Sequence, residues 1–128
     1  MTPGETFYLT NVSGTRHVVV VLADIPERNE VLLVSITTYK AYKDNTCIIE
    51  QRDYAWLQHT SCIDYGRAFL AVRSCLQREI DEGRVSLGPP PVSQKLLQRI
   101  IEGLFISKRT HKKSIRLSAL FPNFKIGE

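Results

Sequence analysis

Short apolar runs rich in β-branched residues dominate the first 72 residues of the chain. Residues 5–12, 16–24 and 31–40 each form such a run, too short and too uniform for an amphipathic helix. The pattern therefore predicts three β-strands. Turn-forming residues separate them, and the stretch 24–30, with its Asp, Pro and Asn, predicts a hairpin between the second strand and the third.

The next part of the chain continues the β pattern in shorter segments. Residues 47–51 predict a short fourth strand, and residues 61–72 predict two short strands with a break near Gly66. Residues 52–60 suit either a helical turn or a loop. Because the strands follow one another closely through short turns, the pattern favours an antiparallel sheet that closes into a small barrel.

A helical period replaces the β pattern in the last third of the chain. Residues 74–83 predict one helix, and the Gly-Pro-Pro-Pro stretch at 88–91 can continue neither a helix nor a central strand. A second helix is predicted at about 92–106, with Ser93 as its N-cap. Its apolar residues fall on one face, which must be buried. The expected fold class is mainly β (α+β): a small antiparallel β-barrel with a C-terminal helix packed on it.

The positive charge is concentrated at the C-terminus. The 128 residues fit a single domain, which we expect at residues 1–107, followed by a basic extension at 108–128. That extension holds six Lys and Arg against one Glu, although the whole chain carries a net charge of only +4. A basic segment favours phosphate-rich partners. A merely solvated tail fits equally well. The candidate substrate-binding residues are Lys108, Arg109, Lys112 and Lys113.

Several classes of function lack sequence support. No apolar run approaches the roughly 20 residues of a membrane span, and the N-terminus does not resemble a signal peptide. The three cysteines show no disulfide pattern, so we expect a cytoplasmic protein. No Cys or His pair has zinc-ligand spacing, and the serine-hydrolase, P-loop and Rossmann motifs are absent. We expect neither a metal nor a cofactor.

Polar residues at the strand ends carry the candidate chemistry. Arg16 opens the second predicted strand, and Thr37 and Thr38 close the third. In an antiparallel hairpin these ends are neighbours, with His17 alongside. Arginine, hydroxyls and imidazole together suit a phosphodiester. An edge arginine with ordinary β-sheet threonines explains the same spacing, and from spacing alone it is the favoured interpretation.

A second polar group, in residues 59–67, includes His59 and Ser61. Strand alternation puts Ser61 on one face and Asp64 on the other. The group suits either a packed strand with one wet face or a second wall of the same site. The packed strand is favoured.

The chain resembles the MazF/PemK family of toxins from bacterial toxin–antitoxin pairs over about residues 3–106. The likeness rests on five stretches: "PGETFYL", "GTRHVVVVLAD", "NEVLLVSITTYK", "SCIDYGRAFLAV" and "VSQKLLQRIIEGL". The resemblance implies an SH3-like barrel, usually a homodimer, and a metal-independent endoribonuclease for single-stranded RNA. By the same likeness, Arg16 matches the catalytic arginine and Thr37 the phosphate-binding threonine. His17 stands where the family usually has proline, and we assign it proton transfer or base stacking as a hypothesis.

Two functions from different classes are consistent with these observations. The first is a toxin of a type II toxin–antitoxin system, an endoribonuclease restrained by a cognate antitoxin protein. The second is a non-catalytic module on the same barrel that binds nucleic acid or a target protein.

Overall fold

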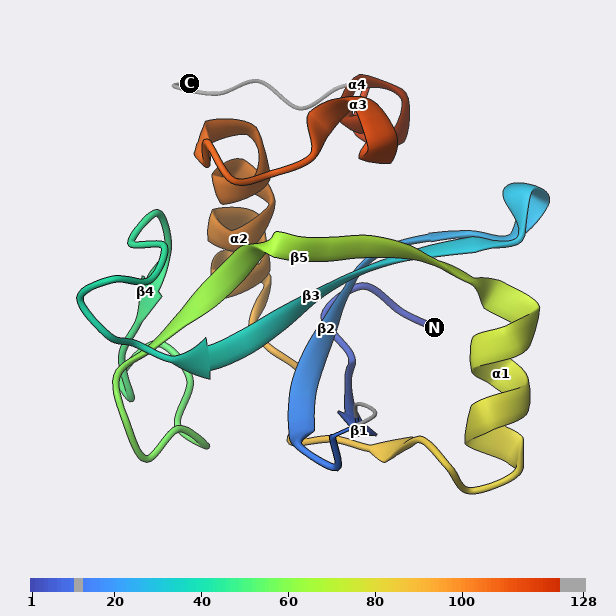
Figure 1. The fold of residues 1–128 in the computed structure, drawn as a ribbon, viewed down its shortest axis with the longest axis horizontal. Helices are drawn as coiled ribbons and strands as arrows, with labels where there is room; N and C mark the ends of the chain where they lie inside the picture. The colour runs from blue at the N-terminus through green and yellow to red at the C-terminus, as the bar shows by residue number, and fades with distance from the viewer. Residues whose placement is uncertain (11–12, 123–128) are drawn as a thin grey trace.

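The computed structural model describes residues 1–10 and 13–122, and six of its segments form one antiparallel sheet. The strand order is β4-β5-β3-β2-β1-β6 (Figure 1). The strands are β1 (Thr6–Thr10), β2 (Arg16–Ile25), β3 (Glu30–Thr38), β4 (Ile48–Ile49), β5 (Ser61–Val72) and β6 (Ser86–Leu87). The antiparallel α+β class is thus confirmed. The predicted first strand also took in residues 11–12, which lie outside the described residues.

The sheet is open, which corrects the expectation of a closed barrel. Within the described residues, β4 pairs only with β5 and β6 only with β1, so these two strands form opposite edges. Each of the two is only two residues long. Strands this short provide no ladder long enough to close the sheet.

Both faces of the central strands are covered, which explains the unbroken valine run of β2. Val18 and Val20 belong to one apolar core, and Val19 and Val21 to another on the opposite face. Helix α2 (Gln94–Ile106) packs on the first face, and α1 (Arg73–Asp81) contributes Leu76 to the second. A strand buried on both faces has no polar alternation, which is why this one reads as continuous apolar sequence.

The two predicted helices and the hairpin are confirmed. Helix α2 begins after Ser93, whose Oγ accepts a hydrogen bond from the Leu96 amide at 3.1 Å. This satisfies one of the free amides at the helix start. The connection between β2 and β3 is a short 3-10 helix, η1 (Pro26–Arg28), closed by Asn29 in the left-handed conformation.

Strand β5 is continuous, so the prediction of two separate strands is wrong, although the irregularity lies where it was expected. The pairing with β3 jumps from Ser35–Asp64 to Leu33–Phe69, so residues 65–68 bulge opposite a single β3 residue. Such a bulge bends and twists the strand. Residues 50–60 form turns and contain neither a strand nor a helix.

The described part of the basic extension folds onto the domain. It forms two short helices, α3 (Lys112–Ile115) and α4 (Leu117–Leu120), on the same side of the sheet as α2 (Figure 1). Ile115 and Leu117 are only 3% and 4% exposed and belong to the same apolar core as the buried face of α2. Removing the extension would therefore expose part of that core.

Candidate functional site

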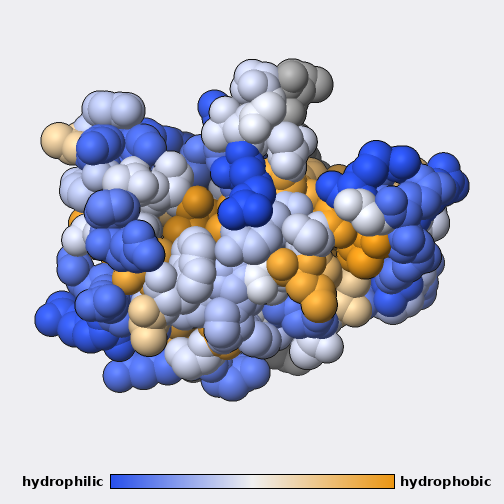
Figure 2. Space-filling model, turned by 90° about the horizontal axis from the view of Figure 1, so that it is seen from below, coloured by the Kyte–Doolittle hydropathy of each residue, from blue (hydrophilic) through white to orange (hydrophobic). Residues whose placement is uncertain are grey.

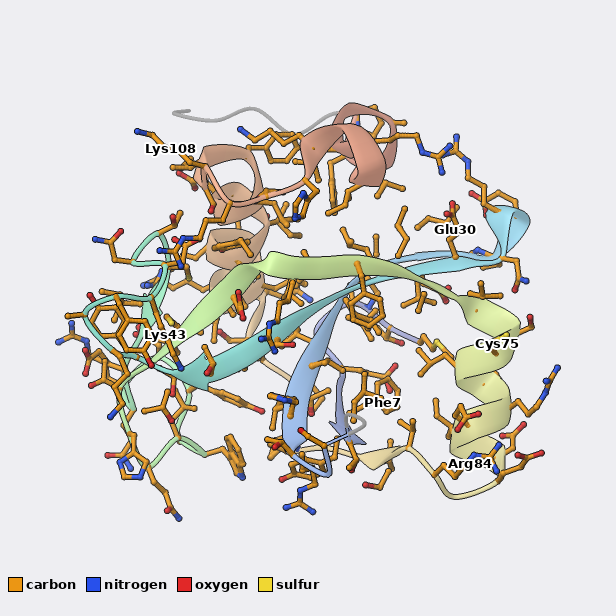
Figure 3. All side chains as sticks on the ribbon, viewed as in Figure 1. Phe7, Glu30, Lys43, Cys75, Arg84 and Lys108 are labelled. Carbon is orange, nitrogen blue, oxygen red and sulfur yellow. The ribbon has the colours of Figure 1, made fainter. Side chains whose placement is uncertain are left out.

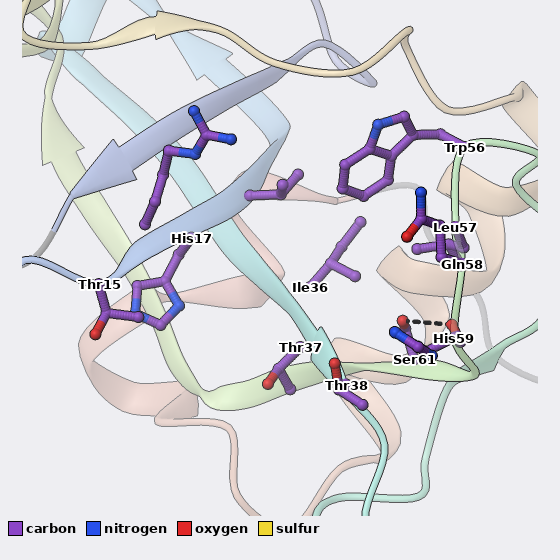
Figure 4. A pocket seen from close by; sticks show the side chains of 12 residues that line it. Thr15, His17, Ile36, Thr37, Thr38, Trp56, Leu57, Gln58, His59 and Ser61 are labelled. Carbon is purple, nitrogen blue, oxygen red and sulfur yellow. Dashed lines mark hydrogen bonds between the residues drawn. The ribbon is translucent and has the colours of Figure 1, made fainter.

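A cavity of about 470 Å³ opens where β2 begins and β3 ends. Figure 4 shows His17 on one side of this cavity and Trp56 on the other, with Ile36 between them. Six of the predicted site residues line it: Arg16, His17, Thr37, Thr38, His59 and Ser61. The structure thus brings the two polar groups of the sequence together at one place.

The register of β2 and β3 decides which of these side chains are direct neighbours. The last pair of the ladder is Val18–Ile36. Continuing the register sets His17 across from Thr37 and Arg16 across from Thr38. Because side chains alternate along a strand, Arg16 lies toward the α2 face and Thr37 toward the opposite one. Arg16 and Thr37 therefore line the cavity from different faces of the sheet, and the nearest cross-strand partner of Thr37 is His17.

Arg16 is oriented by an aromatic ring of the neighbouring strand. Its guanidinium carbon lies 4.1 Å from the centroid of the Tyr8 ring. Tyr8 belongs to β1, which pairs with β2 through Thr10 and Arg16 at this end. A cation held over a ring face is restricted without being neutralised. The Tyr8 ring therefore fixes where the Arg16 guanidinium lies, beside the cavity.

Lys43 is a site residue that the sequence analysis missed. Its Nζ donates to Thr37 Oγ1 at 2.9 Å and to the Thr38 carbonyl oxygen at 2.9 Å. The residue lies in the turn after β3, and Figure 3 shows it beside the end of that strand. A lysine six residues beyond Thr37 carries no pattern of its own, because only the turn's path brings it back.

A second cavity, of about 450 Å³, adjoins the first. His17 and Thr37 line both cavities, and Lys43, Arg67 and Phe69 line the second. The two cavities thus meet at the strand ends, with Lys43 beside their shared wall. One carboxylate is present as well: Asp64 Oδ2 lies 3.5 Å from Arg67 Nε.

The far wall of the first cavity comes from the loop before β5. Ser61 is buried, and its hydroxyl donates to the His59 carbonyl at 2.9 Å, as Figure 4 shows. His59 itself is exposed in the loop. Trp56, in the same loop, lines the cavity and was not predicted. Its only sequence signal is that it is the single tryptophan, in a stretch that suited a loop.

The turn that carries Lys43 is fastened to the start of the C-terminal extension. Buried Asp44 accepts hydrogen bonds from Ser107 Oγ at 2.6 Å and from the Thr46 amide at 2.9 Å. Burial acts to raise the pKa of Asp44, but hydrogen bonds from Ser107 and Thr46 outweigh it, so the pKa lies below its usual value. Arg109 Nη2 also donates to the Tyr42 carbonyl at 3.1 Å. These bonds set the position of the turn.

The predicted basic residues of the extension lie away from both cavities. Lys108, Arg109 and Lys112 are exposed and line neither of them. Figure 3 shows Lys108 beside the C-terminal end of α2. The Lys113 side chain lies outside what the structure describes. Arg109 contacts the cavity region indirectly, because its side chain donates a hydrogen bond to the turn that carries Lys43.

The cysteines near the site are not activated nucleophiles. Cys62 and Cys47 are both buried, and burial raises the pKa of each thiol. A thiol with a raised pKa stays protonated at neutral pH and is a weak nucleophile. Within residues 1–10 and 13–122, no three His, Cys, Asp or Glu side chains gather as a metal-binding group would.

Comparison with known proteins does not assign the chain to a family. Neither the protein-family models nor the curated proteins give a match to this chain. In the described part of the chain, every helix is too short or too polar to cross a bilayer. The inference of function therefore rests on the site itself.

Proposed function

We propose that the protein is an endoribonuclease that cleaves single-stranded RNA without a metal ion. One observation carries the proposal: Arg16, His17 and Thr37 line the same cavity at the strand ends, although from two faces of the sheet, and Lys43 donates a hydrogen bond to Thr37 there. An imidazole can move the protons in cleavage by an internal 2′-hydroxyl, and cations and a hydroxyl can stabilise the charge that builds up on the phosphate.

The proposed reaction uses the RNA's own 2′-hydroxyl as the nucleophile. This hydroxyl loses its proton to a base and attacks the adjacent phosphorus. The bond from phosphorus to the 5′-oxygen then breaks, and that oxygen takes up a proton. The products are a 2′,3′-cyclic phosphate and a 5′-hydroxyl end. His17 is the proposed proton carrier, since imidazole both accepts and donates protons near neutral pH.

The remaining groups stabilise the negative charge that develops on the phosphate oxygens. The guanidinium of Arg16 and the ammonium of Lys43 provide fixed positive charge there. Thr37 Oγ1 accepts its hydrogen bond from Lys43, which leaves the hydroxyl proton free to be donated to a phosphate oxygen. The hydrogen bond from Lys43 thus supports Thr37 in the role that the MazF/PemK resemblance assigns to it.

We also propose that the protein is related to the MazF/PemK toxins and has the partners that such toxins have. We treat the open sheet as an incompletely closed relative of the SH3-like barrel in MazF/PemK toxins. On this basis the protein acts on RNA in the cytoplasm, as a homodimer, and a cognate antitoxin restrains it. A small antitoxin gene beside this one, together with growth arrest on expression alone, would support this part of the proposal.

The second candidate is a non-catalytic module that binds single-stranded nucleic acid or a target protein. The observation that favours it is the placement of Arg16 and Thr37 toward different faces of the sheet, which suits gripping a chain from two sides. Such a module would bind RNA and leave it intact.

The experiment that separates the two candidates is incubation of the purified protein with mixed single-stranded RNA in EDTA. The proposal predicts discrete cuts with cyclic phosphate ends. DNA of the same sequence must stay uncut, because it lacks the 2′-hydroxyl. Intact RNA that co-purifies with the protein would favour the binding module instead.

A further inference from the structure

Two exposed aromatic side chains stand on either side of the strand-end site. Trp56, 42% exposed, lines the first cavity, and Phe69, 40% exposed, lines the second. His17 and Thr37 belong to both cavities and so lie between the two rings. Figure 2 shows that apolar side chains also reach the surface as separate patches among hydrophilic ones.

Both rings are attached to well-fixed parts of the chain. Trp56 lies 6.1 Å, centroid to centroid, from the ring of Tyr54. Tyr54 is buried, and its hydroxyl donates to the Pro90 carbonyl. Phe69 stands on β5, paired with Leu33 in the centre of the sheet. A ring already held in place has less conformational freedom to lose when a ligand stacks on it, which favours binding.

The charges between the rings favour an anionic chain. Arg16 lies at the first cavity, and Lys43 and Arg67 lie at the second, whereas Asp64 is the one carboxylate among the residues that line the two cavities. A groove that combines cationic side chains with aromatic rings is how proteins hold single-stranded nucleic acid, with phosphates on the cations and bases stacked on the rings. Each cavity also falls within the range of about 300–1,000 Å³ for small-ligand sites.

We propose that Trp56 and Phe69 are base-stacking platforms for the two unpaired nucleotides that flank the phosphate held at His17 and Thr37. The proposal rests on the proposed function only for the kind of ligand, single-stranded nucleic acid, and it does not require cleavage. It makes the site selective for unpaired segments, because bases within a duplex are not free to stack on protein rings.

The test measures binding of an oligonucleotide that cannot be cleaved. Trp56 is the only tryptophan in the chain, so its fluorescence reports directly on stacking. A single-stranded 2′-O-methyl tetranucleotide should quench this fluorescence as it saturates the site. The same sugar-phosphate chain with abasic positions should bind roughly tenfold more weakly or worse, because base stacking on an aromatic ring contributes about that much. It should also leave the fluorescence unchanged.

The matched variants are Phe69→Leu and Tyr42→Leu. Phe69→Leu removes a platform, keeps an apolar side chain on β5, and should weaken tetranucleotide binding by roughly tenfold. Tyr42→Leu removes an aromatic ring that is 77% exposed and lines neither cavity, so affinity should be unchanged. Circular dichroism of both variants checks that they fold.

Several results would overturn the assignment of Trp56 and Phe69 as base-stacking platforms. One is an abasic chain or a fully paired duplex that binds as tightly as the single-stranded tetranucleotide. Another is a tetranucleotide that saturates the site without quenching Trp56 fluorescence. A third is a Phe69→Leu variant that binds the tetranucleotide as tightly as the parent. Absence of any binding would overturn the platforms and the proposed function together. Quenching and the Phe69 effect without any RNA cleavage would uphold the platforms and refute the endoribonuclease.

Discussion

Lys43 Nζ lies 2.9 Å from Thr37 Oγ1, so a cation from the turn after β3 is fixed against a hydroxyl at the end of that strand. Its other hydrogen-bond partner is the neutral carbonyl of Thr38. In the described residues, no carboxylate forms an ion pair with Lys43, so its charge is available to a ligand. The pair joins a charge to a hydroxyl at the site where Arg16 and His17 also lie.

Replacing Lys43 with Met should lower kcat/KM for RNA cleavage by roughly ten- to a hundredfold, because a hydrogen bond to a charged group contributes about 1.5–3 kcal/mol. The apolar stem is kept, so the turn should still pack. The control is Lys40→Met, which removes an exposed charge from the same turn and lines neither cavity. Cleavage assays under identical salt compare the two. If Lys43→Met and Lys40→Met lowered kcat/KM equally, only the net charge of the protein would matter for cleavage.

Asp44→Asn should lower the free energy of unfolding by about 1.5–3 kcal/mol at neutral pH, because it weakens the charge-assisted bond from Ser107. The folded-state pKa of Asp44 lies below its usual value, so the folded protein binds this proton less readily than the unfolded chain. The stabilisation is therefore complete above the ordinary carboxyl pKa of about 3.9 and is lost as the pH falls through the folded pKa.

Urea denaturation of the parent and Asp44→Asn from pH 7 to pH 2 measures this effect. The difference in the free energy of unfolding between the two proteins should become smaller as the pH falls. Asp81→Asn, which changes an exposed carboxylate on α1, should show little difference at any pH. If the difference in the free energy of unfolding between the parent and Asp44→Asn did not change with pH, the charged carboxylate of Asp44 would not be the source of the stabilisation.

Gly103→Ala should destabilise the protein by about 1–3 kcal/mol or prevent folding, because a β-carbon there would lie 1.9 Å from Tyr65 Oη. That hydroxyl is fixed, since it donates to the Ile100 carbonyl at 2.8 Å. The matched control is Gly66→Ala, where the nearest atoms lie at an ordinary 3.7 Å. Thermal denaturation compares them. Similar melting temperatures would refute the close packing of α2 on β5.

Replacing both Lys108 and Lys112 with Gln should reduce the salt dependence of RNA binding if the basic extension contacts RNA. The slope of log affinity against log salt should fall by up to about 0.7 for each single-strand phosphate contact that is lost. Substitution is a cleaner test than truncation, because Ile115 and Leu117 are part of the core. An unchanged slope would make these lysines solvated surface residues.

The parts of the fold that local patterns determine could be predicted from the sequence. The β2–β3 hairpin follows from two β-branched runs around Pro26 and Asn29, and α2 follows from its N-cap and apolar face. Closure of the sheet could not be predicted, because it depends on how long the edge strands β4 and β6 become. Continuity of β5 through Gly66 was also missed, because a bulge allows a glycine within a pairing strand.

The candidate site could be predicted only where strand register determined it. Arg16, His17 and Thr37 come together because antiparallel pairing brings the start of one strand to the end of the next. Lys43, Trp56 and Phe69 were missed because turn paths and a bulge place them, and neither leaves a periodic signal. Burial of α3 and α4 was missed for a similar reason, because a short basic segment shows no amphipathic period.

The most direct test of the central claim compares RNA cleavage in EDTA by the parent, Arg16→Ala, Thr37→Ala and Arg28→Ala, with the ends of the products mapped. Arg28 lies in η1, at the opposite end of the same hairpin, so its replacement controls for the loss of one arginine. We expect 2′,3′-cyclic phosphate ends from the parent and Arg28→Ala. Arg16→Ala and Thr37→Ala should cleave at least about a hundredfold more slowly, roughly the cost of losing one transition-state contact. Intact RNA with the parent protein, or equal rates for all four proteins, would contradict the central claim.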